Sequence, residues 1–465
     1  MALLIVVAAL CFLMIVAYRG YSVILFAPVA ALGAVLLTDA SLVAPMFTGL
    51  YMDKLVGFLK LYFPVFLLGA VFGKLIEVSG FSKSIVAATI RLVGSERAML
   101  SIVLVCALLT YGGVSLFVVV FAVYPFAAEM FRQSQIPKRL IPGTIALGAF
   151  TFTMDALPGT PQIQNIIPTA FFGTNAWAAP MLGTIGAIFI LVLGLTYLEW
   201  RRRVAAKLGE GYGDNALNEP VPFAGTVLAN PLIAILPLVL VGVANKGLGV
   251  LIPRYYGSSH EFVPAVIGNA APVVQEISKV AAIWAVEGAL LIGIAAVLLL
   301  AWKAVLHSFA EGSKAAIGGA LLAAMNTASE YGFGAVIAAL PGFLVIADAL
   351  AAIPNPLINE AITVTALAGI TGSASGGMSI ALAAMAESFI ANANAAGISM
   401  EVLHRVAAMA SGGMDTLPHN GAVITLLAVT GLTHRQAYKD IFAITLIKTL
   451  AVFVVIATFY LTGWV

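Results

Sequence analysis

The sequence predicts an all-α polytopic membrane protein with about 11–14 membrane segments, arranged as two related halves. Three observations carry this prediction. Hydrophobic residues occupy 62% of the 465 positions and charged residues only 9%, which is too little charge to cover a water-exposed surface. Apolar runs of about 20 residues, long enough to cross roughly 30 Å of hydrocarbon, recur along the chain. Short motifs also occur twice in the same order, which indicates an internal repeat.

Charge and cysteine content exclude several classes of function. A formal net charge of +2 is too small to indicate a nucleic-acid partner. Cys11 and Cys106 both lie in apolar runs, so we expect no disulfide framework, no metal site and no cofactor. Residues 2–18 are interpreted as a retained first span, because no Lys or Arg precedes the apolar run and no cleavage-like stretch follows it.

The first half, residues 1–198, opens with two spans joined by only three residues, which must form a tight antiparallel pair. Two later segments are each short for a full crossing, which favours a re-entrant arrangement. The predicted segments of this half are 2–18, 22–38, 55–77, 83–95, 97–111, 115–131, 139–155 and 177–198.

A polar linker, residues 199–228, separates the halves and starts with Glu199-Trp200 followed by three consecutive arginines. Positive charge beside membrane spans is retained in the cytoplasm, so we place the linker there. The second half, residues 229–465, is rich in Ala, Gly and Ser, which let helices approach closely. Its predicted segments are 230–246, 278–302, 304–325, 359–371, 378–394, a helix ending near Asp415 and a final apolar helix after Lys439-Asp440.

A Met-Asp-x-Leu-Pro motif places one aspartate in each half, Asp155 and Asp415, at an offset of 260 (415 − 155). Pro158 and Pro418 follow. Proline lacks the N–H that continues a helix and disfavours helical dihedrals in the residue before it. Both helices should therefore break beside their carboxylate.

A glycine pair forms the second repeated motif. Gly112-Gly113-Val114-Ser115 is echoed by Gly376-Gly377-Met378-Ser379 at an offset of 264 (376 − 112). Adjacent glycines cost a helix about 1 kcal/mol each, and non-helical backbone persists at membrane depth only where protein or a wet cavity surrounds it. Each pair is thus predicted to be the tip of a re-entrant hairpin or an unwound helix, followed by a helix N-terminus that favours anions.

A third, weaker echo pairs Glu77 with Glu330 at an offset of 253 (330 − 77). Together with Glu129 and Glu387, these glutamates lie in or beside apolar runs. They are second-rank candidates for carrying a proton. A structural role, in which each glutamate pairs with a neighbouring group, is the simpler explanation.

Interrupted segments at matching positions of an inverted repeat are typical of secondary transporters, whose sites form where the breaks meet. Carboxylates inside a membrane are costly and often relay protons, and desolvation raises a carboxylate's pKa toward a range useful for loading and release. Asp155 and Asp415 are therefore the predicted proton-coupling residues. Alternatively, each aspartate caps its broken helix. His419, beside Asp415, is a second titrating candidate or a donor to an anion.

The tips and breaks contain no Lys or Arg, so these segments offer no fixed positive charge to a substrate with several negative charges. Hydroxyls, amides and helix N-termini suit one carboxylate with a few hydroxyl groups, which indicates a small monocarboxylate. The predicted substrate-binding residues are Gly112, Gly113, Ser115, Thr160, Gln162, Ser373, Ser375, Gly376, Gly377, Ser379, His419 and Asn420.

The stretches GGVSLFVVVFAVYPFA (112–127) and SGGMDTLPHNGAVITLLAVTGLTHRQAYKDI (411–441) resemble the gluconate permease family of the ion transporter superfamily, and the resemblance extends over essentially the whole chain. It implies uptake of sugar acids or short hydroxy acids with protons across the bacterial inner membrane. It also implies a homodimer with scaffold and transport domains, two re-entrant hairpins and elevator-like movement. The LPGTPQ and LPHNG variants look closer to hydroxybutyrate-permease-like members than to gluconate carriers.

Three alternatives remain open. Ser373 and Ser375 among glycines suggest a membrane hydrolase, but no Gly-x-Ser-x-Gly or His-Glu-x-x-His pattern is present, and we expect no enzyme activity. A channel explains the interrupted repeats less well than alternating access does. A sodium-coupled carrier is the strongest rival, because tip carbonyls and hydroxyls are also sodium ligands.

Overall fold

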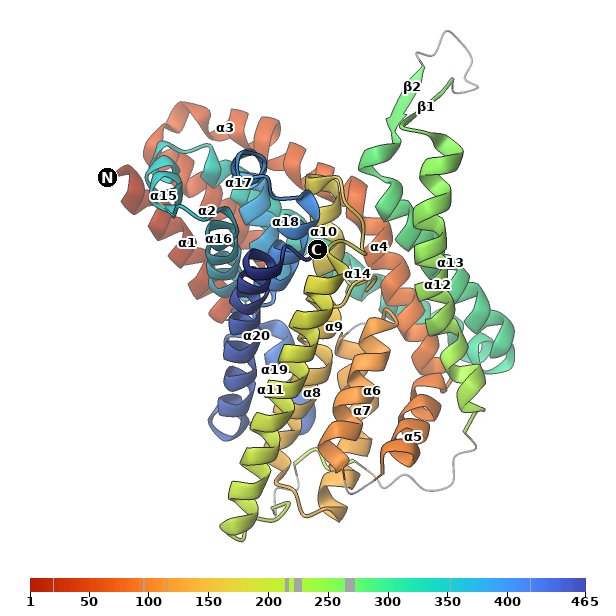
Figure 1. Cartoon of the computed structure of the whole chain (residues 1–465). Helices are drawn as coiled ribbons and strands as arrows, with labels where there is room; N and C mark the ends of the chain where they lie inside the picture. Colours follow the sequence, from red (N-terminus) through yellow and green to blue (C-terminus); the bar gives the residue numbers. More distant parts are fainter. Residues whose placement is uncertain are drawn as a thin grey trace.

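A computed structural model describes residues 1–19, 21–94, 97–114, 116–213, 217–220, 228–263, 272–351, 353–418 and 420–465. Two predicted site residues, Ser115 and His419, lie outside the described residues. Within this part the regular structure is helical apart from one antiparallel hairpin, β1 (Ser259–Phe262) with β2 (Val273–Glu276). The all-α prediction is confirmed (Figure 1).

The first half consists of a long helix pair, a re-entrant hairpin and a broken helix. Short helical turns connect α2 with α4, and a 3-10 turn (Lys138–Leu140) precedes α8. Its helices are α1 (Ala2–Tyr18), α2 (Val23–Thr38), α3 (Val43–Met46), α4 (Met52–Val78), α5 (Phe81–Val93), α6 (Ala98–Tyr111), α7 (Leu116–Gln133), α8 (Ile141–Ala149), α9 (Phe152–Asp155), α10 (Ile163–Phe172) and α11 (Pro180–Lys207).

Within the described residues, the second half has a similar order of helices, without counterparts of the short α3 and α9 and with the hairpin inserted between α12 and α13. Its helices are α12 (Pro231–Tyr256), α13 (Ala281–Leu300), α14 (Trp302–Ala338), α15 (Pro341–Ala351), α16 (Pro356–Thr371), α17 (Ala374–Ala395), α18 (Met400–Ser411), α19 (Gly421–Thr430) and α20 (His434–Thr462).

Many of these helices suit a bilayer. Within the described residues, 6 helical stretches are long and apolar enough to span one, and shorter apolar helices accompany them. Large apolar side chains such as Leu232, Leu299 and Leu461 are more than three-quarters exposed on the outside of these helices. Because such side chains are stable in lipid and not in water, the chain is a multi-pass membrane protein.

Several helix ends recur at a spacing close to 260 residues, which reveals the repeat. Val78 ends α4 and Ala338 ends α14, and Phe81 and Pro341 begin the next helices, both at an offset of 260 (338 − 78; 341 − 81). Helix contacts are duplicated too, since α6 packs on α8 as α16 packs on α18, and α2 packs on α14 as α13 packs on α4. In Figure 1, α5 and α6 lie at the bottom of the molecule, and α15 and α16 lie nearer its top. The halves are therefore inverted relative to each other.

This spacing corrects two of the sequence pairings. Gly112 ends α6 as Gly372 ends α16, again at 260 (372 − 112), so Gly372-Ser373 is the second tip. Gly376 and Gly377 lie inside the first turns of α17 and not in an unwound tip. A Cβ on Gly377 would overlap the backbone of Ala368, so this glycine serves close packing of α17 on α16.

The pairing of Glu77 with Glu330 is also wrong. At an offset of 260, the counterpart of Glu77 near the end of α4 is Ile337 (77 + 260) on α14. A motif of small residues or a single glutamate is too short to give the register, whereas helix ends do. Glu401, His404 and Arg405 lie on helix α18, and α11 continues to Lys207, past the predicted start of the linker.

Candidate functional site

The first tip is held against the first break. Gly113 adopts a left-handed conformation (φ 95°), which reverses the chain after α6 and leaves carbonyls without helical partners. The side-chain amide of Gln162, which precedes α10, donates to the carbonyls of Thr110 (2.7 Å) and Val114 (3.3 Å). The Tyr111 hydroxyl donates to the Pro158 carbonyl (2.9 Å). These hydrogen bonds therefore hold the first tip and the first break together.

The second tip is held in the same way. Gly372 ends α16 in a left-handed conformation (φ 66°), and the Ser373 hydroxyl accepts from the N–H of Gly376 as N-cap of α17. Asn420 donates its amide to the Gly372 carbonyl (2.8 Å), and its oxygen caps α19 through the N–H of Val423 (2.8 Å). Gln162 and Asn420 both occupy the N-cap position of the helix after their break. The sequence predicts that both residues bind substrate, and this stays a prediction. In the structure their side-chain amides hold the two tips in place.

The two breaks meet through Asp155. This residue ends α9, is only 2% exposed, and its Oδ1 has no hydrogen-bond partner among the described residues. Its Oδ2 lies so close to Gly412 that a Cβ there would overlap it. Gly412 is three residues before Asp415, so the Asp155 carboxyl lies against the segment that carries the second carboxylate. The structure thus brings the two predicted carboxylates together.

A buried lysine is the main feature that sequence reasoning missed. Lys448, on α20, forms an ion pair with Asp415 and donates to the carbonyl of Phe150 (3.2 Å). Its side chain is 2% exposed. The signal was present, because a lysine near the middle of an apolar helix is unusual and points to a buried partner. Asp415 therefore has a fixed counter-ion, and Asp155 has none at hydrogen-bond distance.

A second missed group, on α18, holds the first break from the opposite side. Arg405 is fully buried and donates to the carbonyls of Asp155 (2.9 Å) and Ala178 (2.7 Å) and to the side-chain oxygen of Asn165 (3.0 Å). His404, also fully buried, contacts the same Asn165 oxygen (3.2 Å) and the Thr174 hydroxyl (2.6 Å). These contacts satisfy carbonyls that the broken helix leaves free. The Arg405 guanidinium therefore donates its hydrogen bonds to acceptors of the chain.

The second tip gathers hydroxyl groups. Thr327 of α14 lies 3.2 Å from Ser375, and Ser375 lies 3.5 Å from Ser373, oxygen to oxygen. Ser379 is fully buried, and its hydroxyl has no partner among the described residues. Three hydroxyls at the start of α17, with that of Thr327 beside them, can bind an anion or, through their oxygens, a small cation.

Other candidates are less clearly placed. Thr160 is fully buried with a hydroxyl that lacks a partner in the described part, and its carbonyl accepts from Asn165 (3.0 Å). Among the described residues, no hydrogen bond joins the first tip to the second. Each tip is bound to its own break, and the breaks are joined to each other.

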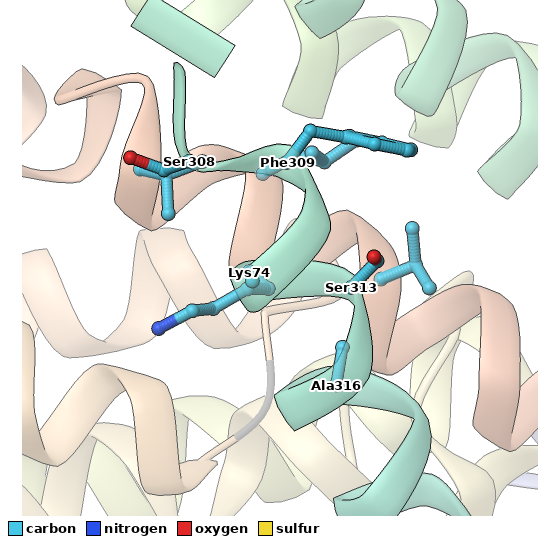
Figure 2. Close-up of a pocket in the computed structure, with 9 residues that line it drawn as sticks. Lys74, Ser308, Phe309, Ser313 and Ala316 are labelled. Atoms are coloured by element: carbon cyan, nitrogen blue, oxygen red, sulfur yellow. The ribbon is translucent and has the colours of Figure 1, made fainter. Parts of the chain in front are cut away.

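A small pocket lies apart from these residues. Figure 2 shows Lys74 of α4 and Ser308, Phe309, Ser313 and Ala316 of α14 around it. Its volume is about 10 Å³, enough for about one water molecule, and no predicted site residue lines it. The described residues also hold no cluster of three His, Cys, Asp or Glu side chains suited to a metal ion.

The linker is tied to the ends of α7 and α8 by charge pairs. Arg139 donates to both oxygens of Glu210 (2.7 Å each), which holds the pKa of that carboxyl below its ordinary value. Partial burial raises the pKa of Glu219, but the ion pair with Lys138 (2.7 Å) and contacts with Tyr212 and Arg132 outweigh it and lower the pKa overall.

No protein-family model matches this chain. The fold is similar to the crystal structure of the Alcanivorax borkumensis YdaH transporter, described as having an unusual topology, with a TM-score of 0.51 over 92% of this chain and 90% of that one. At 15% identity this likeness shows the fold alone. The chain is 59% identical over 474 residues to a protein of Bacillus subtilis (strain 168) named Uncharacterized transporter YxjC, and the match covers 100% of both. The chain therefore belongs to the transporter family of YxjC.

Proposed function

We propose that the chain takes up a small hydroxy monocarboxylate, such as 3-hydroxybutyrate or gluconate, by proton symport across the bacterial inner membrane. The meeting of the two helix breaks at Asp155 is the observation that carries this proposal. An unpaired carboxyl in a site that both halves form is a suitable proton carrier for alternating access.

The two carboxylates differ in the roles we propose for them. Asp415 is paired with Lys448, so adding a proton to it would leave the lysine buried and unpaired. The carboxyl of Asp155 has no cation at hydrogen-bond distance. We therefore assign the moving proton to Asp155 and a fixed, charge-balancing role to Asp415 with Lys448.

The proposed substrate class follows from the charge balance of the site. The two buried cations, Lys448 and Arg405, are both engaged by acceptors of the chain. A substrate with several negative charges would lack counter-ions, whereas one carboxylate suits a helix N-terminus with neighbouring hydroxyls. The resemblance of residues 411–441 to gluconate permeases supports the same class.

Sodium coupling is the second candidate, supported by the hydroxyl oxygens of Thr327, Ser373 and Ser375 at the second tip. An enzyme is disfavoured, since the protein of 59% identity is named a transporter.

One liposome experiment tests the proposal. Uptake of labelled 3-hydroxybutyrate and gluconate is measured under an inward proton gradient without sodium, for the wild type, Asp155→Asn and Asp53→Asn. Asp53 lies exposed on α4 and provides the matched control. Gradient-driven uptake that only Asp155→Asn abolishes supports the proposal. Uptake that needs sodium overturns proton coupling, and uptake of neither acid overturns the substrate class.

A further inference from the structure

Glu330 occupies an unusual position on α14. It is 3% exposed, and its Oε2 has no hydrogen-bond partner among the described residues. The carboxyl group lies against Gly376 in the first turn of α17, where a Cβ would overlap both Glu330 oxygens. Only a glycine at position 376 allows this approach. The proton route proposed through Asp155 does not involve Glu330.

The turn that Glu330 contacts is suited to an anion. Helix α17 is 22 residues long, and its first N–H groups point out of the helix with the positive end of its dipole. Ser373 accepts from the Gly376 N–H, and the hydroxyls of Ser375 and Ser379 lie in the same turns. A substrate carboxylate would bind at this N-terminus, and the carboxyl of Glu330 lies against the first turn beside Gly376, with its Oε2 unpartnered among the described residues.

No cation neutralises Glu330 in the described part of the chain. The hydroxyl of Tyr51, which precedes α4, donates to the carbonyl of Ser329, the residue before Glu330 (3.2 Å). Helix α2, which packs on α14, carries no titratable side chain. Among the described side chains, the titratable residues on the other packed helices form no ion pair with Glu330; they are Asp53, Lys54, Lys60, Tyr62, Lys74 and Glu77 on α4, Glu287 on α13 and Glu387 on α17.

We infer that Glu330 makes substrate binding at the second tip depend on a proton. When ionised, its carboxylate occupies the N-terminus of α17 and excludes the carboxylate of the substrate by charge and by volume. When Glu330 takes up a proton from solvent, it loses its charge, and the substrate carboxylate replaces it at the helix N-terminus; after release of the substrate the proton leaves. This inference rests on the proposed function, since it takes the substrate to be a small monocarboxylate.

Equilibrium binding in detergent tests the inference without transport. The apparent Kd of labelled 3-hydroxybutyrate and of gluconate is measured from about pH 5 to pH 8. If the ionised Glu330 carboxylate competes with the substrate, the apparent Kd of the wild type should rise about tenfold per pH unit above the pKa of that carboxyl. Glu330→Gln, a neutral side chain of the same shape, should bind with nearly constant affinity over this range. Glu387→Gln, exposed on the same α17, should behave as the wild type.

A second variant keeps the inference testable if Glu330→Gln fails to fold. Gly376→Ala would push the Glu330 carboxyl away from α17 and should also reduce the pH dependence. A Glu330→Gln protein that keeps the wild-type slope overturns the inference and leaves the proposed function standing. Absence of wild-type binding to both acids at every pH overturns the substrate class and the inference with it.

Discussion

Lys448 and Asp415 form a buried ion pair that links α20 to the second helix break. Removing one partner of such a pair leaves a charge without compensation and costs about 3–5 kcal/mol, whereas removing both costs much less. We expect Lys448→Met to lower the free energy of unfolding by that amount, and the double variant with Asp415→Asn to recover most of it. Thermal unfolding in detergent measures both, and equal losses in the single and double variants would contradict the pairing.

Asp155→Asn should behave differently from Asp415→Asn. The amide of asparagine replaces a carboxyl that has no ion-pair partner, so the melting temperature should change little while proton-driven uptake falls to the level of empty liposomes. Asp415→Asn should lower the melting temperature, because Lys448 loses its counter-ion. Comparing melting curves with uptake for the two variants separates coupling from stability. A large melting shift for Asp155→Asn would show that this carboxyl is structural.

Asn420→Ala should loosen the second tip. The change removes the cap of α19 and the hydrogen bond to the Gly372 carbonyl, each worth about 1 kcal/mol. Amide hydrogen exchange should rise at residues 371–377 and hardly at the first tip. Thr425→Ala, which removes only a hydroxyl contact within α19, is the control. Unchanged exchange at the tip would mean that the amide does not brace it.

Arg405→Lys should destabilise the first break despite conserving charge. A lysine ammonium cannot span the carbonyls of Asp155 and Ala178 together with Asn165, so a loss of about 3 kcal/mol is expected. Arg203→Lys, on the exposed end of α11, should have almost no effect. Thermal unfolding of the two variants provides the comparison, and equal stabilities would refute the bracing role of Arg405.

Acid should release the linker. The pKa values of Glu210 and Glu219 are lowered in the folded chain, so their contribution to stability is present above their ordinary value of 4.5 and is lost as the pH falls through the lowered values. Hydrogen exchange of residues 208–213, corrected for intrinsic pH effects, should increase below about pH 4.5. Glu219→Gln should produce part of this increase at neutral pH. If residues 208–213 exchange equally slowly in the wild type and in Glu219→Gln, these ion pairs do not hold the linker.

The sequence was informative where the physical signal was local. Proline after Asp155 and Asp415 and the glycines at 112–113 predicted the interruptions, because helix breaking depends on the backbone itself. Lys448 and Arg405 could not be placed at the breaks in this way, since they lie on other helices and reach them only through tertiary packing. The pairing of Gly112 with Gly376 failed because small residues serve both turns and close helix contacts, which look alike in a sequence.

The inverted halves share their architecture but not their polarity. In the described part, the buried Asp, Glu, His, Lys and Arg residues of the second half are Glu330, Glu360, His404, Arg405, Asp440 and Lys448, whereas those of the first half are Lys138 and Asp155. Exchanging the conformations of two halves converts an inward-facing into an outward-facing state. With most of the buried charge on one side of the approximate two-fold axis, that exchange moves different groups in each direction. In the alternating-access cycle proposed above, the two end states would therefore differ in energy even in a symmetric membrane, and the chain itself would set the resting orientation of the empty carrier.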